Sequence, residues 1–199
     1  MSTLPRVVAL ILATLFAPTA VNNLSLAQEP SGESFLKLSF EQFDQDMNGG
    51  WRVNAKSRKY ADAATMIESY LSQRDDLTPE NKRMLHFHAG QMWAMGDQKT
   101  KAIEHLKKST QSKENDFLRW NAYVAGTIAF LEKDTDKLEA AREEVAKAEI
   151  PLSFNKNLVV LDKLRESPES SYRKIFEGLM DKNKKSAIKE RHRKSDEQP

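Results

Sequence analysis

Residues 79–111, PENKRMLHFHAGQMWAMGDQKTKAIEHLKKSTQ, show the most informative helical pattern in this chain. Thr78 precedes them and predicts a helix start, because a capping hydroxyl followed by proline and an acidic residue suits the N-terminus of a helix. We expect this helix to run to about Met95, where a Gly-Asp pair breaks it. A second helix is predicted from Thr100 to Thr110, with its apolar residues on one face: Ala102, Ile103 and Leu106. The stretch therefore predicts a helical hairpin.

The buried face of this second helix recurs along the chain. Alanines at 63, 102 and 141 are 39 residues apart (102 − 63 and 141 − 102). Four positions after each alanine stands an aliphatic residue, and seven positions after it stands a tyrosine, a serine or an alanine. These positions lie on one face of a helix. Hairpins at a fixed period are typical of stacked helical arrays, although chance agreement among alanine-rich helices is the alternative. The nine positions are Ala63, Ile67, Tyr70, Ala102, Leu106, Ser109, Ala141, Val145 and Ala148.

The 79–111 hairpin resembles a tetratricopeptide repeat. That pattern has a small residue and then an aromatic residue on the first helix, a turn, and a small and a large apolar residue on the second helix. Glycine lets the facing helix approach, and the aromatic ring fills the space beside it. The corresponding residues here are Gly90, Trp93, Gly96, Asp97, Ala102, Leu106 and Ser109.

The neighbouring units resemble the pattern less closely. In residues 120–148, Thr127 and Phe130 take the first-helix positions, and the turn is predicted to be about two residues longer. Before Ala63, the Gly-Gly-Trp segment at 49–51 leaves room for only a short leading helix. The segments FDQ, GGWR, AATMIESYL and WNAYVAGTIAFL together also resemble a family of small exported bacterial proteins without assigned function. That resemblance implies the fold and export, and no activity.

These patterns predict an all-α fold in which about three tetratricopeptide-like hairpins form a short right-handed superhelix over residues 28–180. Further helices are expected over 34–47, 60–73, 117–131, 138–148 and 155–164, with a last one from Pro168 to Leu179. Tetratricopeptide phasing places these residues on the inner face: Met84, Phe87, Gln91, Ala94, Met95, Asn121, Val124, Ile128 and Leu131. The predicted partner-binding residues among them are Phe87, Gln91, Met95, Asn121, Val124 and Ile128.

This predicted inner face is mostly apolar. Exposed apolar patches of that extent are uncommon on soluble monomers, so another segment is expected to cover it. The C-terminal residues 155–179 have an apolar face of their own. We therefore predict that they pack on the first helices and close the array into a compact bundle, which would move any binding surface to an edge or to the tail.

The N-terminus predicts export. The apolar run 7–17 is too short to cross a bilayer as a helix, which needs about 20 residues, and it suits the apolar region of a signal peptide. Small residues precede Gln28, so residues 1–27 are predicted to be removed and the mature protein to be periplasmic or extracellular. Cleavage after Ala20 and an uncleaved N-terminal anchor are the alternatives.

Composition limits the remaining possibilities. The chain has no cysteine, so no disulfide framework can form, and its 31 basic and 29 acidic residues give no general attraction to nucleic acid. Residues 182–194 hold seven lysines and arginines against one acid. We expect 181–199 to be a basic, disordered tail, either an ordinary solvated terminus or a peripheral contact with an anionic envelope surface.

Two patterns could carry chemistry. Asp44, Asp46 and Asn48 match the first half of an EF-hand loop, but alanine stands at position twelve, where calcium needs a bidentate glutamate. His86 and His88 are two apart and point to different faces of a helix, which favours packing or surface roles over a metal site.

No nucleophile elbow or phosphate loop occurs. The sequence thus predicts a non-enzymatic module that binds a protein or peptide without a cofactor. The alternative is a structural protein that binds the envelope through residues 182–194 or calcium through residues 44–49.

Overall fold

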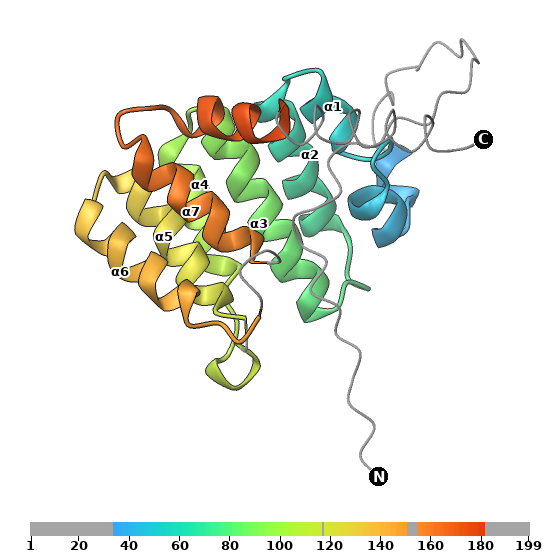
Figure 1. Cartoon of the computed structure of the whole chain (residues 1–199). Coiled ribbons are helices and arrows are strands. Elements are labelled where there is room, and N and C mark those ends of the chain that lie inside the picture. The colour runs from blue at the N-terminus through green and yellow to red at the C-terminus, as the bar shows by residue number, and fades with distance from the viewer. Residues whose placement is uncertain (1–33, 117, 151–154, 182–199) are drawn as a thin grey trace, which may run out of the picture.

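The computed structural model describes residues 34–116, 118–150 and 155–181, and its regular elements there are all helical (Figure 1). This confirms the all-α prediction. The predicted signal peptide and almost all of the basic tail lie outside these residues. The elements are η1 (Ser34–Lys37), η2 (Glu41–Gln45), α1 (Arg52–Lys56), α2 (Tyr60–Gln73), α3 (Pro79–Met95), α4 (Lys99–Lys108), η3 (Lys113–Asn115), α5 (Trp120–Glu132), α6 (Thr135–Ala146) and α7 (Lys156–Glu166), followed by a final helix over residues 172–181.

Short turns join the helices into packed pairs. Helix α3 packs against both α2 and α4, α5 packs against α6, and α7 packs against α5 and α6. The start of α3 forms as predicted, since the Thr78 hydroxyl accepts a hydrogen bond from the backbone N–H of Asn81 at 3.1 Å. None of the helices in the described part of the chain combines the length and apolar character that crossing a membrane requires.

All nine positions of the predicted recurring face are buried. Seven of them lie on α2, α4 and α6, while Ser109 caps the end of α4 and Ala148 lies two residues after α6. The two least enclosed members are Ala141 and Ala148, at 8% and 9% exposure. The same helix face is therefore buried at a 39-residue interval, as the sequence pattern predicted.

Two glycines lie where helices come close together. A Cβ atom on Gly90 would lie 2.8 Å from Leu106 Cγ of α4. A Cβ atom on Gly126 would lie 2.8 Å from Leu161 Cδ2 of α7 and 3.1 Å from Ala141 Cβ of α6. Gly126 thus lies where α5, α6 and α7 come close together, one residue before Thr127, to which the resemblance assigns the small first-helix position. Thr127 is buried and donates its hydroxyl to the Tyr123 carbonyl within its own helix.

The predicted longer turn in the second hairpin is also wrong. The turn between α3 and α4 covers residues 96–98, whereas the turn between α5 and α6 covers only 133–134. The additional residues lie in the helices, mainly in α6, which begins six residues before Ala141. An aspartate cap starts α6 early, because the Asp134 carboxylate accepts from the Lys137 backbone N–H at 3.0 Å.

The first predicted helix, over 34–47, is divided in two. Ser39 and Gln42 exchange side-chain-to-backbone hydrogen bonds at 3.0 and 3.2 Å, an arrangement that starts a new helical turn at this point. The result is the short helix η1 followed by the π-helical turn η2. The expected short leading helix of the first hairpin is α1.

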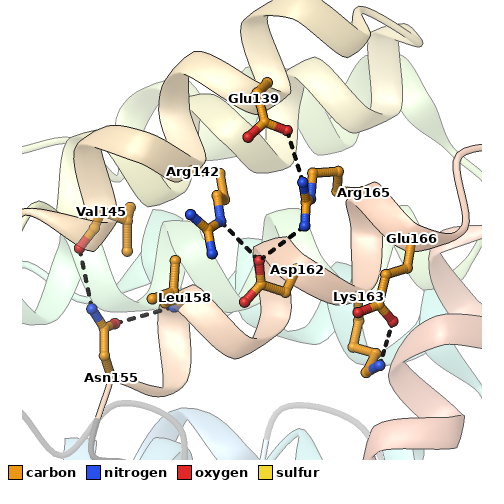
Figure 2. Close-up of polar contacts among 9 residues, drawn as sticks. All are labelled: Glu139, Arg142, Val145, Asn155, Leu158, Asp162, Lys163, Arg165 and Glu166. Atoms are coloured by element: carbon orange, nitrogen blue, oxygen red, sulfur yellow. Dashed lines mark hydrogen bonds and ion pairs between the residues drawn. The ribbon is translucent and has the colours of Figure 1, made fainter. Parts of the chain in front are cut away.

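The C-terminal helices cover the hairpins from one side (Figure 1). Helix α7 is fastened to α6 by the ion pair between Arg142 and Asp162 at 2.8 Å, and the Asn155 amide donates to the carbonyl of Val145 at 3.1 Å (Figure 2). In the final helix, Tyr172 packs on Phe130 of α5.

The final helix also reaches α3 and α2. The guanidinium of Arg173 donates to the carbonyl of Met95 at the end of α3 at 2.6 Å, and the Tyr60 hydroxyl at the start of α2 donates to Glu177 at 2.8 Å. These contacts agree with the predicted packing of residues 155–179 on the first helices of the hairpins.

Candidate functional site

The predicted partner-binding face is largely buried inside the described molecule. Phe87 and Val124 are 0% exposed and Met95 is 1% exposed. The Phe87 ring packs edge-on against Trp120 at 4.5 Å between ring centroids, so it belongs to the core between α3 and α5. These three predicted contact residues are therefore corrected to core residues, because the C-terminal helices and the neighbouring hairpin enclose them.

The other three predicted contact residues have structural contacts as well. Gln91 is buried at 9% exposure. The Asn121 amide group donates to the carbonyl of Gln111 at 2.8 Å and accepts from its N–H at 2.9 Å, which ties the loop after α4 to the start of α5. Ile128 is half-buried against the hydrophobic core. The structure does not bring these six side chains together on an open surface.

The loop that resembles an EF-hand is organised around a buried carboxylate. Asp44 is 0% exposed and accepts from the Trp51 indole N–H at 2.9 Å, while His88 Nδ1 lies 2.7 Å from the same oxygen. Burial opposes ionisation of Asp44, but His88, Arg52 and the indole N–H outweigh it and lower the pKa of the carboxyl. The contact between Asp44 and His88 thus joins the N-terminal segment to α3.

This arrangement does not present a calcium cradle. The Asp46 carboxylate accepts from the backbone N–H of Asn48 at 2.9 Å, and the Asn48 side-chain oxygen accepts from Lys56 at 2.6 Å. With Asp44 buried, the three expected ligands point to separate partners. Among the residues that the structure describes, no group of three histidine, cysteine or acidic side chains is arranged to hold a metal ion.

An open depression between α2, α3 and α4 gathers a different set of polar side chains. Its volume is about 380 Å³. We call it the histidine depression, and it is lined by Glu68, Leu71, Ser72, Lys82, His86, His105 and Lys108. Two of the chain's four histidines meet there, with 3.0 Å between His86 Nδ1 and His105 Nδ1.

Glu68 orients the histidine pair. Its Oε1 atom lies 2.9 Å from His105 Nε2 and accepts from the indole N–H of Trp93 at 2.7 Å. The hydrogen on His105 is therefore assigned to Nε2, where the carboxylate accepts it. His105 Nδ1 then carries a lone pair and accepts from the N–H at His86 Nδ1. In this neutral state, Nε2 of His86 is the ring nitrogen that remains without a proton.

Both imidazoles are held neutral. Burial, then the neighbouring His105 and Lys108, lower the pKa of His86 to about 4. Burial also lowers the pKa of His105, although Glu68 acts in the opposite direction. The pair therefore stays uncharged at neutral pH, and a negative charge placed beside it would favour uptake of a proton.

The charge around the depression is unbalanced. Neither Lys82 nor Lys108 forms an ion pair with a residue that the structure describes, whereas many other charged residues do. The Ser72 hydroxyl donates to the carbonyl of Ser69 in its own helix at 3.0 Å, so it is not aimed at an imidazole. The chemistry that this arrangement supports is binding of an anion and exchange of a proton.

Sequence reasoning did not identify this site. It predicted that His86 and His88 point to different faces, and this is confirmed, because His88 contacts Asp44 while His86 contacts His105. Nothing in the spacing of Glu68, His86 and His105 indicated that they meet, since they come from three helices.

A comparison with models of known protein families, with curated proteins and with solved structures found no match to this chain. The tetratricopeptide resemblance and the resemblance to small exported bacterial proteins therefore stay predictions.

Proposed function

We propose that this protein is an exported, non-enzymatic module that binds another protein or a peptide, and that its hairpins form a short tetratricopeptide-like superhelix. Support for the superhelix comes from the recurring buried face, from Gly90 against Leu106 and from Gly126 against Ala141. Support for binding comes from the histidine depression, which the C-terminal helices do not line.

The observation that carries the binding proposal is the histidine depression. It combines an apolar side chain, Leu71, with two lysines that lack a carboxylate partner among the described residues and with an imidazole that has an uncommitted nitrogen. Concave sites with a few convergent polar groups are where proteins usually bind their ligands. The partner surface is thus expected at the edge formed by α2, α3 and α4, away from the predicted inner face.

Affinity capture from the source envelope tests this proposal. The bait is the mature chain, residues 28–199, used in parallel with a Lys82→Ala/Lys108→Ala double variant. A matched control, Lys107→Ala/Lys156→Ala, removes two exposed lysines that do not line the depression. The proposal expects a partner that the parent and the control retain and the first variant loses. Equal retention by all three baits, or no specific partner, would contradict it.

A further inference from the structure

We infer that the histidine depression binds a side-chain carboxylate of an acidic peptide segment, and that the His86–His105 pair takes up one proton from solvent on binding. This inference rests on the proposed function and names the chemistry of the partner. It follows from the positions of the charged groups around the pair.

The charged groups that face His86 come from all three helices of the depression. Helix α3 contributes Lys82 and α4 contributes Lys108, while Glu68 of α2 reaches the pair through His105. Glu104 of α4 acts on His105 from nearby. Of the groups that line the depression, two are cationic and one is anionic, so the lining carries one net positive charge while the imidazoles are neutral. This positive charge attracts a carboxylate.

The size and apolar content of the depression favour a peptide over an inorganic anion. A volume of about 380 Å³ can hold an amino-acid side chain with part of its backbone. Leu71 offers apolar contact to the stem of a glutamate or to a neighbouring residue. A phosphate dianion would also lie close to the carboxylate of Glu68, which repels the second charge more strongly.

The proton balance is simple. In the unbound state His86 has its proton on Nδ1, directed at His105, and a bare lone pair on Nε2. A bound carboxylate adds a negative charge beside the ring, which favours the imidazolium form. Nε2 then forms an N–H bond with a proton from solvent and donates it to the carboxylate, while Nδ1 keeps its hydrogen bond to His105. No other bond forms or breaks.

Titration with defined probes tests the inference. The ligand is a capped peptide of alternating glutamate and leucine, and the controls are its glutamine counterpart and inorganic phosphate. Nitrogen NMR of the histidine rings in the full chain reports the tautomer and charge of each imidazole. We expect saturable changes at His86 and His105 with the glutamate peptide only, together with a new proton on His86 Nε2.

Affinity should depend on pH and on the two lysines. Glutamate stays ionised down to about pH 5, so a rise in affinity of about threefold or more from pH 7 to pH 5 reports proton uptake by the protein. This dependence should disappear in His86→Gln. Lys108→Ala should weaken binding about two- to fivefold, whereas Lys107→Ala, one residue away on the outer face of α4, should leave it unchanged.

Three results would overturn the inference: equal binding of the glutamine peptide, binding of phosphate alone, or affinity for the glutamate peptide that is independent of pH. Circular dichroism of each variant ensures that lost binding is not lost folding. If the envelope capture yields a partner that depends on Lys82 and Lys108 while the peptide does not bind, the carboxylate chemistry is wrong and the proposed function stands. If the peptide binds and no partner is captured, the carboxylate chemistry of the depression stands and the proposed function is wrong.

Discussion

The Gly90→Ala substitution tests how closely α3 and α4 approach. The new Cβ atom would lie 2.8 and 3.0 Å from Cγ and Cδ2 of Leu106 and 3.1 Å from the carbonyl oxygen of Ala102. Optimal carbon–carbon contacts are about 3.5–4.0 Å, so the two helices would have to separate by several tenths of an ångström. Leu106 is 0% exposed and the carbonyl is backbone, so neither can simply turn away.

Two opposing effects set the change in the free energy of unfolding that Gly90→Ala causes. Overpacking a core typically costs about 1–3 kcal/mol, whereas replacing glycine by alanine within a helix gains up to about 1 kcal/mol in intrinsic helix propensity. We therefore expect Gly90→Ala to lower the free energy of unfolding by about 1–2 kcal/mol. For a domain of this length, that corresponds to a fall in Tm of about 2–8 °C.

The matched control is Gly178→Ala in the final helix. A Cβ atom there would meet no atom within 4 Å, so only the propensity gain remains. This variant should be unchanged in stability or up to about 1 kcal/mol more stable. Urea unfolding followed by circular dichroism measures both variants. If Gly90→Ala is as stable as Gly178→Ala, the helices of this hairpin are not in close contact, and the packing described for α3 and α4 is wrong.

Four further predictions follow from the packing, the histidine pair, the ion pairs and the N-terminal sequence. Trp93→Ala should lower the free energy of unfolding by about 3–5 kcal/mol in urea unfolding, because the 4% exposed ring leaves a cavity when truncated; an unchanged Tm would place the ring outside the core. Burial lowers the pKa of His86 to about 4, whereas in the unfolded chain the pKa is near 6.5. The unfolded chain therefore binds the proton first, and the free energy of unfolding should fall as the pH drops from about 6.5 toward 4. In thermal melts, His86→Gln should reduce that fall. A double-mutant cycle between Arg142 and Asp162, both half-buried, should give a coupling free energy of about 0.5–1 kcal/mol, and no coupling would mean that the pair does not hold α7 on α6. N-terminal sequencing of the exported protein should begin at Gln28, and an intact Met1 in a membrane fraction would contradict the signal-peptide prediction.

Local sequence signals predicted the helices and their buried faces well. The nine positions of the recurring face are all buried, because one side of a helix is set by a period of about 3.6 residues and needs no knowledge of the partner helix. The start of α3 followed from Thr78 and Pro79 for the same reason, since capping involves only neighbouring residues. The sequence also indicated that the C-terminal segment needs an apolar surface, because it has an apolar face of its own.

The sequence did not predict which residues meet across helices. The close contacts of Gly126 with Leu161 and Ala141 were not predicted, because they depend on how α5 is rotated against α6 and α7. The division of the first helix at Ser39 was missed because its hydrogen bonds to Gln42 compete locally with a continuous helix.

Local sequence patterns were thus sufficient to predict the main helices α2 to α7 and their buried sides, since these depend on residues within a few positions of one another. The packing of the helices against one another makes Phe87, Met95 and Val124 core residues. It also brings Glu68, His86 and His105 into one depression. Their meeting depends on the rotation and separation of three packed helices. Those quantities are set by the complete packing of large and small side chains across the interfaces, and no local pattern contains them.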